Sequence, residues 1–76
     1  MKILNRLTGN DLKKIIAGNL KKYRKQKGLT QEQVAYLAGI TRALYAKYET
    51  EKSGMTVLNL VKLAKVFDVK VDELVN

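Results

Sequence analysis

The sequence predicts an all-α protein, a compact bundle of five short helices. Apolar residues recur at helical spacing along almost the whole chain, and no stretch alternates convincingly over the length of a strand. Capping residues and glycines separate these stretches with short connections. With 76 residues and no internal repeat, the chain has room for only one hydrophobic core.

Capping residues and glycines place the five expected helices along the chain. The helices are expected over residues 11–27, 31–38, 42–49, 57–67 and 71–75. A short polar side chain before a helix can accept a hydrogen bond from its first free backbone N–H groups. The residues expected in this role are Asn10, Thr30, Thr41 and Thr56. Thr30 and Gln33 have capping-box spacing, and Gly28 and Gly39 end the first two helices.

Positive charge is concentrated in the first third of the chain. The formal net charge is +8, and residues 1–27 hold nine basic residues against a single acid, Asp11. Such a surface is typical of proteins that bind a polyanion, most often a nucleic acid, although it can also serve only solubility. Residues 1–10 are expected to form an N-terminal extension, with Ile3, Leu4 and Leu7 docked on a domain of residues 11–76.

The residue types that are missing exclude several classes of function. Without cysteine or histidine, the chain has no disulfide, no thiolate metal site, and neither the usual general base nor the commonest metal ligand. We therefore expect no metal, no cofactor and no enzymatic activity. The sequence shows no signal peptide and no apolar run that could span a membrane, which favours a cytoplasmic location.

Residues 31–49 have the pattern of a helix-turn-helix. Two short helices are joined by a turn that contains Gly39, which can adopt a positive φ, and Ala35 supplies the small residue where the helices cross. We expect Tyr45 and Tyr48 to anchor the second helix to the core. Arg42 and Lys47 then lie on the outward face, with Ala43 and Ala46.

The chain from Ile16 to Val75 resembles the phage repressor and Cro family of DNA-binding domains, the XRE family. The resemblance rests on "NLKKYRKQKGLTQEQVAYLAGITRALYAKYE" followed by "TVLNLVKLAKVFDVKVDELV". It implies the lambda repressor-like bundle, in which residues 42–49 form the recognition helix that enters the DNA major groove.

The resemblance also implies roles for individual residues. The residues at the family's base-reading positions are Thr41, Arg42, Ala43 and Lys47. The residues expected to bind phosphate are Gln31, Tyr45, Thr50, Lys52 and Ser53. Arg24 and Glu49 match a structural ion pair of the family. The chain departs from the family at Glu51 and Met55, where Gly and Pro are common, and this predicts a shifted turn after the recognition helix.

The leading hypothesis is a small transcriptional regulator that binds double-stranded DNA in a sequence-specific manner. We expect a repressor or autoregulator that occupies a palindromic operator as a homodimer, with apolar residues of the last helix as its subunit contact. Those residues are Val69, Val71, Leu74 and Val75. The alternatives are an antitoxin that neutralises a partner toxin and represses its own operon, and a nucleic-acid binder without sequence preference.

Overall fold

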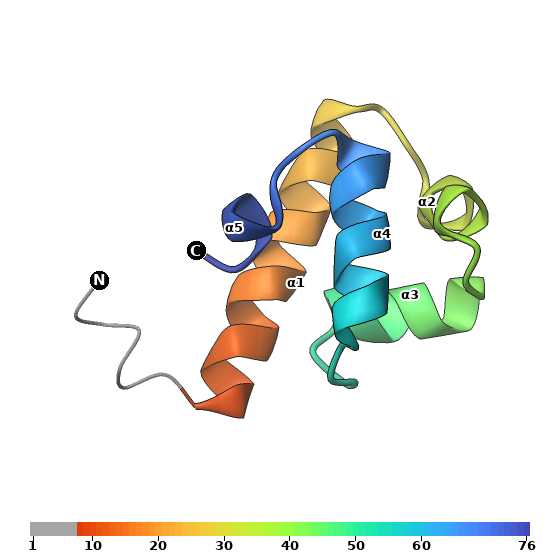
Figure 1. Ribbon diagram of the computed structural model, residues 1–76. Helices are drawn as coiled ribbons and strands as arrows, with labels where there is room; N and C mark the ends of the chain where they lie inside the picture. Colours follow the sequence, from red (N-terminus) through yellow and green to blue (C-terminus); the bar gives the residue numbers. More distant parts are fainter. Residues whose placement is uncertain (1–7) are drawn as a thin grey trace.

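The computed structural model describes residues 8–76 and contains five helices. They are α1 (Gly9–Gln26), α2 (Gln31–Ala38), α3 (Arg42–Glu49), α4 (Val57–Phe67) and α5 (Val71–Leu74), as Figure 1 shows. The described residues contain no strand, so the predicted all-α class is confirmed. The predicted docking of Ile3, Leu4 and Leu7 lies outside the described residues.

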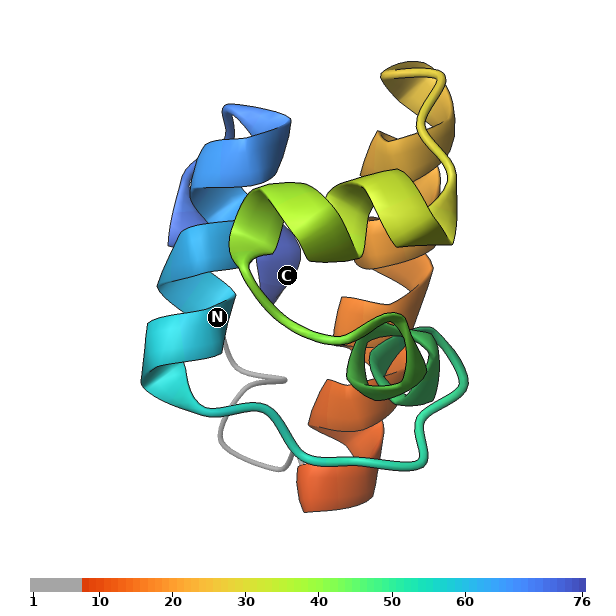
Figure 2. The ribbon, with the colours of Figure 1, turned by 90° about the vertical axis from the view of Figure 1, so that its right-hand side faces the viewer.

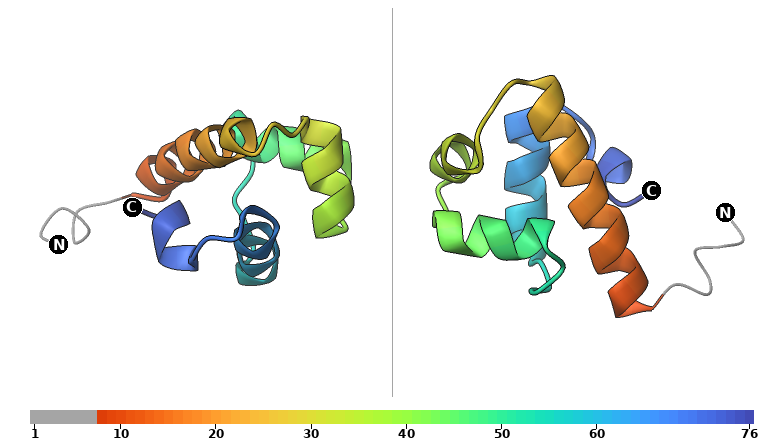
Figure 3. Two further views of the ribbon diagram at one scale, coloured as in Figure 1. Left: turned by 90° about the horizontal axis from the view of Figure 1, so that it is seen from above. Right: turned by 180° about the vertical axis from the view of Figure 1, so that it is seen from behind.

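The helices pack around one another without forming flat layers. α3 packs on both α1 and α2, α2 also packs on α4, and α5 contacts α1 and α4. Seen from above, α1 and α3 lie along one side of the molecule, whereas α4 and α5 lie along the other (Figure 3). α2 bridges the two sides at one end of the molecule.

A single hydrophobic core lies between the helices. Each helix contributes at least one fully buried side chain to it. The largest of these side chains are Leu20, Val34, Tyr45, Leu63, Phe67 and Leu74. Because burying a large apolar side chain stabilises the fold by about 1.5–3 kcal/mol, this core fixes the relative positions of all five helices.

The start of α1 differs from the prediction. The helix begins at Gly9, and Thr8 rather than Asn10 is its N-cap. The Thr8 hydroxyl accepts a hydrogen bond from the Asp11 backbone N–H at 3.1 Å, and the Asp11 carboxylate accepts one from the Thr8 backbone N–H at 2.9 Å. This reciprocal capping box satisfies two N–H groups, which a cap at Asn10 would not do. Residues 9 and 10 thus belong to α1.

The other predicted helix boundaries are confirmed, except that α1 and α5 each end one residue earlier, at Gln26 and Leu74. The hydroxyls of Thr30, Thr41 and Thr56 each accept a hydrogen bond from a backbone N–H three residues further on. α4 is followed by its C-cap residue Asp68, which takes the left-handed conformation with a φ of 57°.

The prediction that apolar residues of the last helix form a subunit contact needs correction. Leu74 is fully buried, and Val69 and Val71 pack against the core, so the last helix leaves little apolar surface for a subunit contact. In contrast, Val57 and Leu58 at the start of α4 are 78% and 63% exposed. Exposed apolar surface therefore lies at the beginning of α4, and also on α2, where Tyr36 and Leu37 are exposed.

Candidate nucleic-acid interface

The turn between α2 and α3 has the geometry that the sequence predicted. Gly39 has a φ of 70°, and the backbone N–H of Ile40 donates to the Ala35 carbonyl at 3.0 Å. This hydrogen-bond pattern ends α2 with Gly39 in the left-handed conformation, which is strained for any residue that has a side chain. Ala35 is buried at the α2–α3 contact, and Ile40 packs on the core. Figure 2 shows α2 crossing in front of the bundle, with α3 below it.

α3 has one buried face and one bare face. Tyr45 and Tyr48 are buried, and the Tyr48 hydroxyl accepts a hydrogen bond from the Asn59 side-chain amide at 2.8 Å, which joins α3 to α4. The predicted base-reading residues are all exposed to solvent. They are Thr41, Arg42, Ala43 and Lys47. Ala46, which we expected to face outward, is half-buried.

Glu49, the last residue of α3, is buried and lies at the centre of a hydrogen-bond network. Arg24 on α1 donates to its carboxylate from Nε at 2.7 Å and from Nη2 at 3.1 Å. The side-chain amide of Gln31, the first residue of α2, donates to the same carboxylate at 3.0 Å, and so does the Tyr45 hydroxyl. One carboxylate thus joins three helices.

The electrostatics of this network keep its carboxylate ionised. Burial acts to raise the pKa of Glu49, but hydrogen bonds from Arg24, Tyr45 and Gln31 outweigh it, so the pKa lies below its ordinary value. The hydrogen bond to Glu49 raises the pKa of Arg24. Burial and the neighbouring Glu49 raise the pKa of Tyr45. Among the described residues, Arg24–Glu49 is the only ion pair.

The network changes the interpretation of two expected phosphate ligands. Tyr45 cannot reach a phosphate, because its side chain is fully buried and its hydroxyl donates to Glu49; that prediction is wrong. Gln31 is half-buried, and its side-chain amide donates to Glu49, so that N–H is not available to a phosphate. Neither bond was visible in the sequence, because tertiary packing decides whether a polar side chain points to solvent or to a buried carboxylate.

The loop of residues 50–56 keeps the usual turn despite its unusual sequence. Glu51 takes a φ of 64°, and the backbone N–H of Lys52 donates to the Lys47 carbonyl at 2.9 Å. This is the same closure that ends α2, with glutamate in place of glycine. The predicted shift of the turn after the recognition helix is therefore wrong. Thr50 and Lys52 are exposed and Ser53 is half-exposed.

The hydroxyls of this loop are partly engaged within the protein. The Thr50 hydroxyl donates to the Ala46 carbonyl at 2.9 Å, and the Ser53 hydroxyl donates to the Gly54 carbonyl at 3.0 Å. The ammonium group of Lys52 has no carboxylate partner among the described residues. The side chain of Lys13 from α1 lies beside this loop at Gly54. A Cβ atom added to Gly54 would lie 3.8 Å from Cε of Lys13.

Within residues 8–76, no three His, Cys, Asp or Glu side chains come close enough together to hold a metal ion. None of the described helices combines the length and apolarity needed to cross a membrane.

Comparison with known families assigns this fold and surface to a class. The helix-turn-helix family HTH_3 matches residues 20–74, and the chain belongs to this family. Control protein C.SmaI of Serratia marcescens is 34% identical over 64 residues, which cover 84% of this chain and 76% of the relative. The HTH-type transcriptional regulator YqaE of Bacillus subtilis is 43% identical over 56 residues, covering 74% of this chain but only 48% of YqaE.

Solved structures give the same result. The restriction-modification controller protein C.AhdI from Aeromonas hydrophila superposes with a TM-score of 0.79 at 31% identity, over 82% of this chain and 94% of C.AhdI. An HTH_3 family transcriptional regulator from Vibrio cholerae gives a TM-score of 0.83 at 30% identity, over 88% of this chain and 38% of that one. The chain is thus a DNA-binding transcriptional regulator of the Cro/repressor (XRE) type.

Proposed function

We propose that the protein binds a specific double-stranded DNA sequence through α3 and acts as a repressor or autoregulator. The observation that carries this proposal is the division of α3 into two faces. Tyr45, Tyr48 and Glu49 fix one face to the core, and the other presents Arg42, Ala43 and Lys47 to solvent. A rigidly held helix with bare basic side chains is suited to the major groove.

The exposed residues of α3 have the chemistry for reading bases. The Arg42 guanidinium can donate two parallel hydrogen bonds to O6 and N7 of guanine, and the Lys47 ammonium can donate to the same edge. The Ala43 methyl suits contact with a thymine methyl. The Thr41 hydroxyl oxygen accepts from the Leu44 backbone N–H, so its own proton remains free for an acceptor on DNA.

Two regions beside α3 are proposed to hold the phosphate backbone. At the start of α2, the free backbone N–H groups favour an anion next to Gln31. After α3, Lys52 is exposed, and the Thr50 and Ser53 hydroxyl oxygens can each accept a hydrogen bond from a water molecule that donates its other proton to a phosphate. Such contacts set the position of the protein on the duplex without reading its sequence.

Selecting bound duplexes from a random DNA pool tests the proposal. We expect a consensus of two inverted half-sites, with a guanine at the position that Arg42 contacts. Enrichment of no sequence, together with affinity that depends only on salt, would show a binder without specificity.

We propose that the protein binds DNA as a homodimer through the start of α4. Val57 and Leu58 are strongly exposed there, directly after the loop that follows α3. Two copies joined near this loop bring their recognition helices to the same face of a duplex, where half-sites are separated by about 34 Å, one helical turn.

Sedimentation velocity tests the dimer. The double variant Val57→Ser, Leu58→Ser is expected to sediment as a monomer at concentrations where the parent is a dimer. Tyr36→Ser is the matched control, because Tyr36 is 82% exposed but lies on α2. A parent that is monomeric, or a double variant that stays dimeric, would contradict this interface.

The names of two related proteins point to a restriction-modification setting. C.SmaI is named a control protein and C.AhdI a restriction-modification controller protein. We propose that this chain likewise regulates a gene cluster that contains its own gene. Footprinting on the DNA upstream of that gene should then reveal a protected operator, and no protection there would exclude autoregulation.

A further inference from the structure

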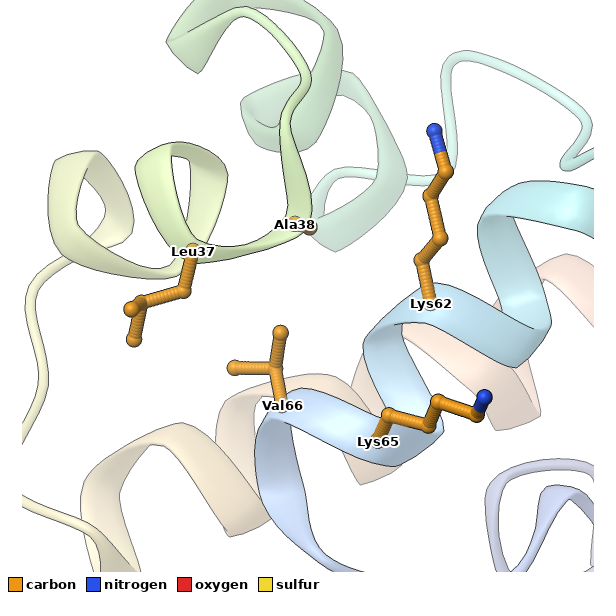
Figure 4. Close-up of a pocket in the computed structure, with 5 residues that line it drawn as sticks. All are labelled: Leu37, Ala38, Lys62, Lys65 and Val66. Carbon is orange, nitrogen blue, oxygen red and sulfur yellow. The ribbon is translucent and has the colours of Figure 1, made fainter.

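An apolar groove lies between the C-terminal half of α2 and the second half of α4. This α2–α4 groove is a shallow hollow of about 480 Å³ lined by Leu37, Ala38, Lys62, Lys65 and Val66. In Figure 4, Leu37 and Val66 lie on opposite sides of the hollow, and both lysines rise from α4. The groove thus has apolar side chains on two opposite sides and basic groups along its α4 side.

The apolar surface continues from the groove over α2. Leu37 is 57% exposed, and its neighbour Tyr36 is 82% exposed, the highest value among the large apolar side chains of the described residues. Leu37 also lines a second hollow, of about 490 Å³, together with Leu29, Tyr36 and the polar side chains of Glu32 and Gln33. Contiguous exposed apolar surface of this kind usually marks an interaction site.

The groove lies apart from the proposed DNA contacts. Figure 2 shows that α2 begins beside α1, on the side of the molecule where α3 lies, and ends beside α4. The two ends of α2 therefore lie on different sides of the molecule. Gln31 begins the helix, whereas Leu37 and Ala38 end it beside α4. A partner in the groove would leave Arg42 and Lys47 free.

The charges of the groove select the chemistry of its partner. Neither Lys62 nor Lys65 forms an ion pair with any described carboxylate. A DNA backbone would engage the two lysines but would gain nothing from Leu37 and Val66. A second copy that docked through the same groove would bring Lys62 and Lys65 against their own counterparts, which like-charge repulsion opposes.

We propose that the α2–α4 groove binds an acidic amphipathic helix of a partner protein. Apolar side chains of that helix, three or four residues apart, would cover Leu37 and Val66, and carboxylates beside them would pair with Lys62 and Lys65. This is helix-in-groove recognition, in which apolar anchors supply affinity and flanking charges supply selectivity. The protein would then bind its partner and DNA on separate surfaces.

A synthetic peptide tests the proposal without knowledge of the natural partner. The probe is a helical peptide of about four turns with leucines on one face and glutamates beside them. The control peptide has lysine in place of each glutamate. Titration of the ¹⁵N-labelled protein should shift the amide signals of Tyr36, Leu37 and Val66 with the acidic peptide, and much less with the control.

Variants of the protein assign the binding to the groove. The double variant Lys62→Glu, Lys65→Glu should lower the affinity for the acidic peptide roughly fivefold to tenfold. Leu37→Ser should lower that affinity at least about tenfold. The matched controls are Lys22→Glu and Leu12→Ser on α1, which should leave the affinity unchanged. Because all these positions are exposed or half-exposed, circular dichroism should show that each variant remains folded.

Other outcomes would overturn the proposal. Equal affinity for the two peptides would show that Lys62 and Lys65 do not select an acidic partner. Shifts centred on Arg42 and Lys47, or displacement of the peptide by duplex DNA, would place the acidic peptide on the DNA-binding surface. Concentration-dependent shifts at Leu37 and Val66 in the free protein would make a second copy the occupant. Lack of DNA binding would contradict the proposed function alone, because the peptide titration contains no DNA.

Discussion

The inward and outward faces of α3 differ in almost every intramolecular contact that they make. The inward face carries Tyr45, Tyr48 and Glu49, which are buried and hydrogen-bonded to one another or to α1, α2 and α4. On the outward face, the side chains of Arg42 and Lys47 make no hydrogen bond or ion pair with the described residues.

This difference separates stability from recognition within one short helix. A helix of eight residues is not stable alone, so α3 depends on the contacts of its inward face. The outward face can be specialised for DNA because the fold does not depend on it. Substitutions on the two faces should therefore change different measurements, and the following predictions test that separation.

The largest effect is expected from Glu49→Gln. Removing the charge leaves Arg24 with an uncompensated, largely buried guanidinium and weakens the bonds from Gln31 and Tyr45. We expect a loss of about 3 kcal/mol in the free energy of unfolding, measured by urea denaturation. Glu32→Gln, an exposed acid on α2, is the control and should change stability by less than about 0.5 kcal/mol. A small loss for Glu49→Gln would show that the network does not hold α3.

Low pH should reduce the stability of the protein by protonating the Glu49 carboxylate on the inward face of α3. The pKa of Glu49 is lower in the folded protein than its ordinary value of 4.5, so its contribution is complete above pH 4.5 and is lost as the pH falls through the folded-state pKa. Stability should thus fall more between pH 7 and pH 3 for the parent than for Glu49→Gln. The pKa of Asp11 is also lowered, by hydrogen bonds from Thr8, but Asp11 is present in both proteins. Parallel pH profiles would contradict this role of Glu49.

On the outward face, Arg42→Ala should affect recognition and leave stability unchanged. We expect a loss of about 1–3 kcal/mol in the discrimination of one base pair, measured by competition between the selected operator and single-base variants. Arg42→Lys, which keeps the charge but not the bidentate geometry, should recover non-specific affinity more than discrimination. Equal loss for operator and random DNA would remove the base-reading role of Arg42.

A smaller effect is expected at the end of α3, where both faces meet the loop. Glu51 has a φ of 64°, a conformation that costs a residue with a side chain about 1 kcal/mol. Glu51→Gly should stabilise the protein by up to about 1 kcal/mol in urea denaturation. Gly39→Ala, at the matching position after α2, should destabilise it by a similar amount. Destabilisation by Glu51→Gly would show that the glutamate side chain has a structural role.

The smallest effect is expected outside α3, at Lys13. Its side chain lies beside the loop that holds Thr50, Lys52 and Ser53, so we expect it to contribute to the same phosphate contact. Lys13→Gln should reduce the slope of log affinity against log salt by about 0.9 without changing the consensus. Lys14→Gln, on the next and more exposed position of α1, should reduce it less. Equal slopes for the two variants would place Lys13 outside the interface.

The sequence predicted those features that depend on neighbouring residues. The Thr30 capping box, Gly39 in the turn and the Thr41 cap are local, and each delimits its helix as expected. The start of α1 was predicted wrongly, although its signal is equally local: Thr8 and Asp11 have the spacing of a capping box. Helix caps and the turn glycine, which depend only on neighbouring residues, thus located the helix-turn-helix almost completely.

Features that depend on distant residues were not predictable in the same way. The Gln31 amide reaches a carboxylate 18 residues away, and nothing in the sequence near Gln31 indicates that contact. Periodicity placed Val57 and Leu58 on a wide apolar arc of α4, but it could not show that no other helix covers them. The left-handed conformation of Glu51 was hidden because glycine usually marks it.

The bare face of α3 has a consequence for how such a regulator can diverge. Since Arg42, Ala43 and Lys47 do not support the fold, they can be exchanged together without a loss of stability. Thr41 is the exception, because its hydroxyl caps the helix, and only a side chain that can also accept this bond, such as serine or asparagine, can replace it. A library that randomises only the other three positions should therefore yield folded variants with new operators, which makes this chain a scaffold for retargeted regulators.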